Sequence, residues 1–323
     1  MSSIQLLAVS KLSPFYAANL QGSYTVHAQL QDTDPAAFAV AAGQIAGIAC
    51  GGESRVSAEL MAQLPALKMI SVMGVGYDGV DVAAAKARGV MVTHTPNVLN
   101  DDVADLAIGL MLSAARQLPA ADRYVRAGQW AEGAMPLARK MSGARLGLVG
   151  MGRIGQAIAT RALAFNMSVA YTSRTAKASL PYRFFDSAKA LAAESDFLVI
   201  ITPGGAATRK MINAEVLAAL GGGGILVNVA RGSVVDEAAL IDALQRGVIA
   251  GAGLDVFEDE PRVPQALCDM PHVVLAPHVG SGTHATRQAM ADLASDNLRL
   301  FFAGQSVKTP VPEMSMNPQL KHG

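Results

Sequence analysis

Short apolar runs alternate with longer segments of helical periodicity along most of the chain. In the first part this pattern predicts four strands, at 4–9, 45–50, 69–73 and 90–93. A second alternation begins at Arg145 and predicts six more, at 146–149, 168–171, 197–202, 225–229, 253–256 and 273–276. Strands that alternate with helices form parallel sheets, so the pattern predicts an α/β protein with two sheets. The six later strands are enough for a complete dinucleotide-binding sheet.

The clearest helical periodicity falls in segments that link the two alternations or follow them. The segment 99–116 has Asn100 and Asp101 available as amino-terminal caps, and 120–127 predicts a second linker helix. The last segment, 284–303, comes after the second sheet is complete, so we expect it to return to the first domain. A chain of 323 residues is long for a single core, which agrees with two domains.

The charge balance and the apolar runs exclude several classes of partner. Lysine plus arginine and aspartate plus glutamate number 26 each, so no net field attracts nucleic acid or an anionic membrane. No apolar run approaches the ~20 residues that a membrane-spanning helix needs. The amino terminus lacks the pattern of a secretion signal, and Cys50 and Cys268 give no disulfide framework. We therefore expect a cytoplasmic protein.

A glycine-rich motif, G-x-G-x-x-G, follows the first strand of the second alternation. Gly150 permits a tight turn, Gly152 leaves room for a pyrophosphate, and Gly155 lets a helix lie close to the strand. The phosphates then meet the amino terminus of that helix, where unpaired N–H groups favour an anion. Arg153 adds a positive charge there. Because a strand precedes the motif and a helix follows it, we predict a bound dinucleotide rather than a turn without a ligand.

The loop after the next strand bears on the choice of dinucleotide. About twenty residues beyond the glycines, an NAD enzyme places an acidic residue against the ribose 2′-hydroxyl. This chain reads Tyr-Thr-Ser-Arg-Thr at 171–175, with no Asp or Glu between Glu132 and Asp186. Arg174 and Lys177 stand instead where a 2′-phosphate would lie, and a guanidinium pairs with a phosphate that a carboxylate would repel. The loop favours NADP over NAD, although the alternative that Arg174 is only a solvated loop charge stays open.

Three polar residues lie at or beyond the carboxyl ends of predicted strands, where open α/β sheets bind their ligands. They are Arg231, Glu260 and His278. Reduction of a 2-oxo acid requires a cation that holds the carboxylate, which suits Arg231, and a proton donor for the carbonyl oxygen, which suits His278. Glu260 would orient the imidazole and raise its pKa. Each residue alone has an ordinary structural explanation, but together they indicate a reductase.

Other histidines and the acidic cluster at 258–260 offer competing sites. His278 follows Pro277 and precedes small residues, which suits a ring held by a loop, whereas His284 falls in a predicted helix and His94 on the approach to a proline. We rank both below His278 as proton donor. Neither His nor Cys falls at ligand spacing beside the acidic cluster, so we predict no metal.

Six segments, in a fixed order, extend the pattern over nearly the whole chain. They are MGVGYDGVD (73–81), TPNVLNDDVADLAIGLML (95–112), GLVGMGRIGQAIA (147–159), NVARGSVVDEAAL (228–240), GLDVFEDEP (253–261) and APHVGSGT (276–283). In these segments the chain resembles the D-isomer-specific 2-hydroxyacid dehydrogenase family, most of all its glyoxylate and hydroxypyruvate reductases and the plant hydroxyphenylpyruvate reductases. It departs from the family at 202–205, Thr-Pro-Gly-Gly, where members commonly have a Leu-Thr-Pro-type sequence.

The resemblance implies two doubly wound parallel-sheet domains. A Rossmann domain that binds NADP is expected at 99–284, and a flavodoxin-like substrate domain, discontinuous in sequence, at 1–98 and 285–323. The resemblance also implies a homodimer joined through the nucleotide domains. With the charge balance, it leaves a small 2-oxo or 2-hydroxy acid as the expected partner, and neither nucleic acid nor membrane.

Carried over position by position, the resemblance implies the same catalytic set of Arg231, Glu260 and His278. It adds the backbone amides of Val75 and Gly76 as donors to the substrate carboxylate. The substrate contacts expected in all are Val75, Gly76, Arg231, His278 and Ser281. Asp255 is expected to meet the nicotinamide carboxamide. The expected cofactor contacts are Gly150, Gly152, Arg153, Ile154, Gly155, Ser173, Arg174, Thr175, Lys177, Thr202, Pro203, Val229, Asp255 and Gly280.

The implied activity is NADPH-dependent reduction of glyoxylate, hydroxypyruvate or a related small 2-oxo acid to the D-2-hydroxy acid by hydride transfer. Three alternatives stay open. One is a reductase for bulkier acids such as hydroxyphenylpyruvate or 2-ketogluconate. Another is a non-enzymatic dinucleotide-sensing protein, like the C-terminal-binding corepressors. The third, a formate or phosphite dehydrogenase, is the least favoured because those members use NAD.

Overall fold

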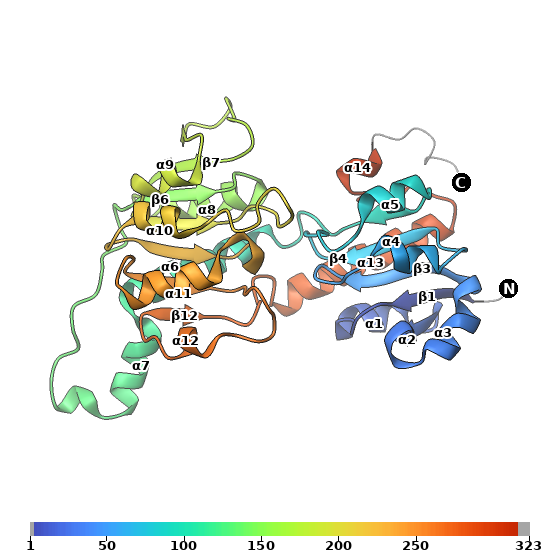
Figure 1. Cartoon of the computed structure of the whole chain (residues 1–323), viewed down its shortest axis with the longest axis horizontal. Coiled ribbons are helices and arrows are strands. Elements are labelled where there is room, and N and C mark those ends of the chain that lie inside the picture. Colours follow the sequence, from blue (N-terminus) through green and yellow to red (C-terminus); the bar gives the residue numbers. More distant parts are fainter. Residues whose placement is uncertain (1–2, 316–323) are drawn as a thin grey trace. The chain divides into compact units, whose positions relative to one another are not determined.

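The computed structural model describes residues 3–315 and divides the chain into two compact units (Figure 1). The first unit combines Met1–Leu99 with Thr283–Gly323, and the second is Asn100–Gly282. Each unit contains one parallel sheet with helices packed on it, which confirms the predicted fold class. In the part of the chain that the structure describes, no helix is both long enough and apolar enough to span a membrane.

The sheet of the first unit has five parallel strands in the order β2-β1-β3-β4-β5, which is the flavodoxin-like order. The strands are β1 (Ile4–Ala8), β2 (Tyr24–Ala28), β3 (Ile45–Gly51), β4 (Met69–Met73) and β5 (Met91–Thr93). The sequence pattern missed β2. It is an edge strand that, among the described strands, pairs with β1 alone, and its side chains are all at least partly exposed, so it lacks the apolar run of a central strand.

In the described part of the chain, eight helical elements accompany this sheet, and only α13 is long. They are α1 (Pro14–Leu20), α2 (Leu30–Thr33), α3 (Pro35–Ala41), η1 (Ala42–Gln44), α4 (Ala58–Ala62), α5 (Val82–Ala87), α13 (His284–Phe302) and α14 (Pro312–Ser315). Although α13 follows the second unit in sequence, it packs against β4 and α1. The Ser71 hydroxyl of β4 donates to the Ala294 carbonyl of α13 at 3.0 Å. The returning helix is therefore part of the first core.

The second unit has seven parallel strands in the order β12-β11-β10-β9-β6-β7-β8. They are β6 (Arg145–Val149), β7 (Ser168–Thr172), β8 (Arg183–Phe184), β9 (Phe197–Ile200), β10 (Ile225–Asn228), β11 (Gly251–Leu254) and β12 (Val273–Leu275). This is the Rossmann order with one strand added, and it reverses between β6 and β9, where such sheets bind nucleotides. The sequence pattern missed β8, which has only two residues.

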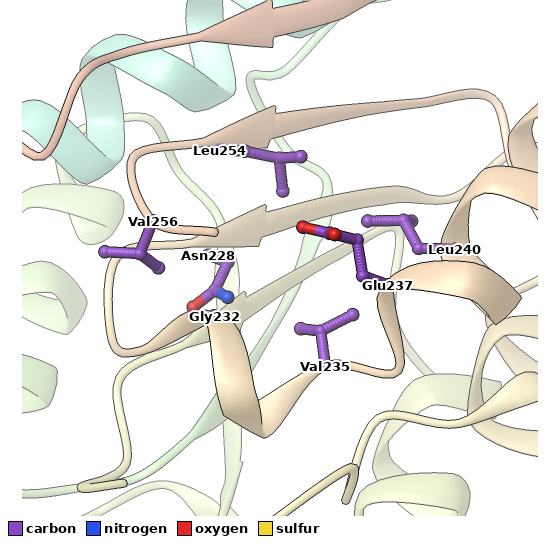
Figure 2. A pocket seen from close by; sticks show the side chains of 7 residues that line it. All are labelled: Asn228, Gly232, Val235, Glu237, Leu240, Leu254 and Val256. Carbon is purple, nitrogen blue, oxygen red and sulfur yellow. The ribbon is translucent and has the colours of Figure 1, made fainter. Parts of the chain in front are cut away.

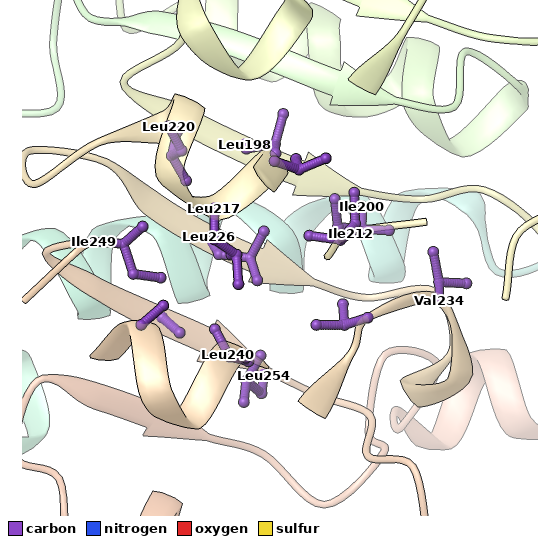
Figure 3. Packing of buried hydrophobic residues seen from close by; sticks show 14 of the residues in the cluster. Leu198, Ile200, Ile212, Leu217, Leu220, Leu226, Val234, Leu240, Ile249 and Leu254 are labelled. Atoms are coloured by element: carbon purple, nitrogen blue, oxygen red, sulfur yellow. The ribbon is translucent and has the colours of Figure 1, made fainter. Parts of the chain in front are cut away.

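Helices cover both faces of this sheet. They are α6 (Asn100–Arg116), α8 (Arg153–Leu163), α9 (Ala188–Ala193), α10 (Ala214–Leu220), η3 (Gly232–Val234), α11 (Glu237–Gln245) and α12 (Gln265–Cys268). Two further elements, α7 (Leu118–Arg126) and η2 (Gln129–Ala131), lie in a segment that extends away from the sheet (Figure 1). Figure 3 shows Leu217, Leu220 and Leu240 of α10 and α11 packed on strand residues such as Leu226 and Leu254. On the other face, a side chain at Gly253 would meet Leu110 of α6 at 3.0 Å. The sheet edge that carries the site thus stands on a core buried on both sides.

The two linker helices differ from the prediction in their starts. Helix α6 begins at Asn100, so Asp101 and Asp102 lie inside its first turn, where carboxylates favour the positive end of the dipole. Asn100 and Asp101 are therefore part of the helix rather than its flanking caps. Helix α7 starts after Gln117, whose φ of 53° is left-handed and breaks the helical path.

Candidate active site

The glycine-rich loop lies at the carboxyl end of β6 and leads into α8, as predicted from the motif. Gly150 has a φ of 111°, which other residues rarely adopt, and a side chain there would meet the Ile201 backbone at 2.7 Å. A side chain at Gly155 would meet the Gly150 carbonyl oxygen at 2.5 Å. These two glycines are explained by backbone geometry and packing.

Neither backbone geometry nor packing within the chain explains the glycine at position 152. Its φ is −73°, which suits any residue, and a side chain placed on it would find no atom within 4 Å. Gly152 is also the cap residue of α8, whose first amides and positive dipole end point into this open space. The loop therefore fits the pyrophosphate of a dinucleotide, because a glycine here is required only when something outside the chain approaches the backbone.

The loop after β7 presents the basic residues predicted to select NADP. Arg174 and Thr175 are exposed, while Ser173 and Lys177 are partly buried. The Ser173 hydroxyl donates to the Thr175 carbonyl at 2.7 Å, and the Lys177 amide donates to the Tyr171 hydroxyl at 2.7 Å. The loop is thus fixed at both ends, with Arg174 between the two attachments.

Arg231 sits in a tight turn after β10. The side chain of Asn228, which is buried, accepts from the Ala230 amide at 3.1 Å and donates to the Arg231 carbonyl at 3.0 Å. A side chain on Gly232 would overlap the Phe257 backbone, with its nearest atom at 1.9 Å. The turn that carries Arg231 therefore packs directly on the loop that leads to Glu260.

His278 and Glu260 form a hydrogen-bonded pair, as expected from their placement after β12 and β11. His278 Nδ1 lies 2.8 Å from Glu260 Oε2, so Nδ1–H donates to the carboxylate. The other oxygen, Oε1, accepts from the Phe257 amide at 3.0 Å, which fixes the carboxylate. With Nδ1 engaged in this way, proton exchange with a substrate is left to Nε2.

The backbone at His278 is left-handed, with a φ of 52°, and Asp255 holds it there. The His278 amide donates to the Asp255 carbonyl at 2.9 Å, and the Asp255 carboxylate accepts from Val279 at 2.7 Å and Gly280 at 2.8 Å. Burial raises the pKa of the Asp255 carboxyl, while these two amides act in the opposite direction. Predicted as a nicotinamide contact, Asp255 thus also supports the loop of the predicted proton donor.

In the first unit, Val75 and Gly76 follow β4. Their backbone amides are the predicted hydrogen-bond donors to the substrate carboxylate. Within the described residues, neither of their amides donates a hydrogen bond to the chain, which suits an anion site. His94, a competing candidate for the proton donor, has Nδ1 2.9 Å from the Val75 carbonyl and its ring edge-to-face with Tyr77 at 5.2 Å. His94 therefore supports this loop. His284, the other competitor, packs edge-to-face on Phe15 at 5.9 Å.

The remaining predicted contacts lie on the same edge of the second sheet. Thr202 and Pro203 follow β9, Val229 follows β10, Ser281 lies in the loop after His278, and Arg153 and Ile154 form the first turn of α8. The Thr208 hydroxyl donates to the Pro203 carbonyl at 2.7 Å and closes the loop that contains the two unusual glycines. These residues share one edge of the sheet, where open α/β sheets bind their ligands. Their contacts with cofactor and substrate, which the family resemblance implies, stay predictions.

A small cavity lies behind the Arg231 turn, lined by Asn228, Gly232, Val235, Glu237, Leu240, Leu254 and Val256 (Figure 2). Its volume of about 10 Å³ is far too small for a substrate. Burial raises the pKa of Glu237, whose carboxylate accepts from the Glu258 amide at 3.2 Å. The cavity is thus a packing feature, in which Glu237 ties α11 to the loop that carries Glu260.

Comparison with known proteins decides the family. The model for the NAD binding domain of the D-isomer specific 2-hydroxyacid dehydrogenases matches residues 108–280. The chain belongs to this family. Glyoxylate/hydroxypyruvate reductase A of Arabidopsis thaliana is 49% identical over 254 residues, which are 79% of this chain and 81% of the relative. Hydroxyphenylpyruvate reductase of Plectranthus scutellarioides is 47% identical, over 85% of this chain and 88% of the relative.

Solved structures of 2-hydroxyacid dehydrogenases match both units of the chain. The crystal structure of NADPH-dependent glyoxylate/hydroxypyruvate reductase from Sinorhizobium meliloti, in complex with NADP and malonate, is 45% identical, with a TM-score of 0.90. The match covers 97% of this chain and 98% of that chain. The expected family resemblance is confirmed.

Two supporting residues of this 2-hydroxyacid dehydrogenase were missed from its sequence. Asn228 bonds two backbone groups of the Arg231 turn, and Tyr171 bonds the backbone of the loop that carries Arg174. Both lie inside predicted strands, where a side chain normally serves packing. The one available signal was at Asn228, because an uncharged polar residue at the buried end of an apolar strand needs hydrogen-bond partners.

Proposed function

We propose that this dehydrogenase reduces small 2-oxo acids, glyoxylate and hydroxypyruvate among them, to D-2-hydroxy acids with NADPH. The observation that carries the proposal is the 2.8 Å bond between His278 Nδ1 and Glu260 Oε2, on a loop held by Asp255. A carboxylate-supported imidazole is a proton donor suited to a carbonyl oxygen at neutral pH. The names of the Arabidopsis and Sinorhizobium relatives support the choice of acids.

The residues of the second unit have distinct proposed roles in this reaction. The Arg231 guanidinium pairs with the substrate carboxylate and fixes the orientation of the ketone. The bound nicotinamide supplies the hydride for the carbonyl carbon. His278 Nε2 gives its proton to the carbonyl oxygen, so that C=O becomes CH–OH, and Glu260 stabilises the imidazolium before the transfer. For the first unit, we propose that the backbone amides of Val75 and Gly76 donate hydrogen bonds to the substrate carboxylate.

Our proposed cofactor preference is NADPH over NADH. Gly152 and the amino terminus of α8 would hold the pyrophosphate, and Arg174 with Lys177 would pair with the 2′-phosphate. Support comes from the exposed position of Arg174 on a fixed loop and from the NADP bound in the Sinorhizobium structure. The same site would accept NADH more weakly, because NADH lacks the group that the two cations recognise.

The same geometry suits one further substrate class, the bulkier 2-oxo acids such as hydroxyphenylpyruvate. The 47% identity to the Plectranthus hydroxyphenylpyruvate reductase favours it specifically. Both classes share the carboxylate and ketone that Arg231 and His278 address, so the catalytic residues do not separate them. Relative kcat/KM values over a panel of small and bulky 2-oxo acids distinguish the two substrate classes.

We also propose a homodimer formed through the arm, which we define as residues 117–140. Figure 1 shows that α7 and the segment after it extend away from the sheet of their own unit. The arm carries four large exposed apolar side chains: Leu118, Val125, Trp130 and Leu137. Such a concentration is typical of an interface, and a second copy of the chain presents the same arm.

A reducing compartment, the cytoplasm, is the proposed location of the enzyme. Cys50 is buried in β3 of the first unit and Cys268 is exposed at the end of α12 in the second, and both are free thiols. Proteins of oxidising compartments more often use cysteines in disulfides.

Two substitutions test the catalytic proposal. His278→Asn removes the proton donor, and we expect kcat for glyoxylate reduction to fall by about 10²–10⁴-fold. Arg231→Gln removes the carboxylate anchor and should lower kcat/KM for the 2-oxo acid, while the Kd for NADPH stays within about twofold. Arg246→Ala, at the exposed carboxyl-terminal cap of α11, is the matched control and should behave as wild type. Near-normal turnover in the His278 variant would refute the assignment of the donor.

A further inference from the structure

We propose that Tyr171 is a positioning residue for cofactor selectivity, and that its buried hydroxyl fixes the loop from which Arg174 reaches the 2′-phosphate. The inference deepens the proposed function and rests on the proposed preference for NADPH. We propose no contact between Tyr171 itself and the cofactor. The tyrosine acts through the backbone of Lys177.

The Tyr171 side chain is held rigidly. It lies on β7, is 1% exposed, and packs edge-to-face against Phe184 of β8 with ring centroids 5.4 Å apart. The backbone on the other side is also fixed, because the Phe185 amide donates to the Tyr171 carbonyl at 2.9 Å. A ring fixed on two sides places its hydroxyl at one point.

That hydroxyl is where the loop after β7 turns back. The Lys177 amide donates to Tyr171 Oη at 2.7 Å across six residues of sequence, and the Lys177 carbonyl accepts from Leu180 at 3.0 Å. Nearer the strand, the Ser173 hydroxyl donates to the Thr175 carbonyl at 2.7 Å. Residues 174–176 are the exposed segment between these attachments. The tyrosine hydroxyl therefore fixes, at Lys177, the end of the exposed segment that carries Arg174.

Fixing this segment affects NADPH and NADH differently. A guanidinium and an ammonium on a fixed loop lose less freedom on binding a phosphate than the same groups on a loose loop. NADH has a hydroxyl in place of the 2′-phosphate, so a fixed pair of cations contributes little to its binding. Tyr171 should therefore influence the ratio of the two cofactors rather than turnover itself.

The test uses Tyr171→Phe in the full chain, which keeps the buried ring and removes only the hydroxyl. We expect the ratio of kcat/KM for NADPH to that for NADH to fall about 2- to 10-fold, the range of a single net hydrogen bond. The Kd of 2′,5′-ADP should rise by a similar factor, while that of 5′-AMP should stay within twofold. Tyr182→Phe, in the same connection between β7 and β8, is the matched control and should leave the ratio unchanged.

A double-mutant cycle shows whether Tyr171 acts through Arg174. If it does, Tyr171→Phe has a smaller effect on the cofactor ratio in the Arg174→Ala background than in wild type. Equal effects in both backgrounds, or an unchanged ratio in the single variant, would overturn the inference. If Arg174→Ala itself leaves the ratio unchanged, it is the proposed NADPH preference that fails. If Tyr171→Phe unfolds, as far-UV circular dichroism would show, the hydroxyl serves the core and the inference is also wrong.

Discussion

His278 shows at the scale of one residue how the fold supports the chemistry. A left-handed backbone costs a residue other than glycine about 1–2 kcal/mol, and His278 adopts it with a φ of 52°. Asp255 offsets the strain by accepting the amides of Val279 and Gly280, and its carbonyl accepts from His278 itself. Backbone strain that the surroundings hold in place is typical of functional sites.

The Glu260 carboxylate has a role that a neutral variant isolates. Glu260→Gln keeps the size of the side chain but removes the charge that stabilises the protonated imidazole of His278. We expect kcat for reduction to fall by about 10-fold or more near neutral pH, and the decline of activity with rising pH to begin at a lower pH. Glu258→Gln, two residues earlier, is the control. Superimposable pH–rate profiles for the Glu260 variant and wild type would contradict the assigned role.

The two cysteines should differ sharply in reactivity. Burial raises the pKa of the Cys50 thiol to about 12, so at pH 8 almost none of it is thiolate, whereas Cys268 is exposed. When the native protein is titrated with a thiol reagent at pH 8, one thiol per chain should react quickly and the second only after unfolding. In Cys268→Ser the quickly reacting thiol should be absent. Rapid reaction of two thiols in folded wild type would show that Cys50 is accessible.

The glycine loop is the element in which a fold requirement and a ligand requirement can be separated. Gly155→Ala places a methyl group 2.5 Å from the Gly150 carbonyl, and we expect the free energy of unfolding to fall by about 1–3 kcal/mol. Gly152→Ala meets no atom of the chain, so its melting temperature should match wild type while the Kd for NADPH rises at least 10-fold. Calorimetry and fluorescence titration measure the two effects. An unchanged Kd for NADPH in Gly152→Ala would show that the pyrophosphate does not bind at this loop.

Elements with a local signal were predictable from the sequence, and those defined by their neighbours were not. The glycine loop and the central strands β4, β6 and β10 carry contiguous apolar or glycine patterns that fix their type within a few residues. Edge strands β2 and β8 exist because a neighbouring strand pairs with them, and the support given by Tyr171 joins positions whose contact appears only after folding. The pair His278–Glu260 was predictable because strand order brings the carboxyl ends of β11 and β12 together.

At the scale of the whole molecule, the arm predicts the oligomeric state. Trp130 is the only tryptophan in the sequence and is 70% exposed within one chain, so its emission reports directly on burial of the arm. We expect wild type to elute as a dimer with blue-shifted tryptophan emission, and Leu137→Glu to elute as a monomer with red-shifted emission. Val40→Glu, an exposed apolar position in the first unit, should remain dimeric. A monomeric wild type would contradict the proposed dimer, and a dimeric Leu137 variant would show that the arm is not its interface.

Hydride transfer from NADPH to a 2-oxo acid is the reaction that we expect of the intact protein. The most direct measurement follows absorbance at 340 nm with the purified enzyme, glyoxylate or hydroxypyruvate, and NADPH or NADH in parallel. We expect cofactor oxidation that depends on the 2-oxo acid, formation of the D-2-hydroxy acid, and a higher kcat/KM with NADPH than with NADH. No oxidation of either cofactor with any 2-oxo acid, although NADPH binds, would contradict this expectation and leave the fold as a dinucleotide sensor.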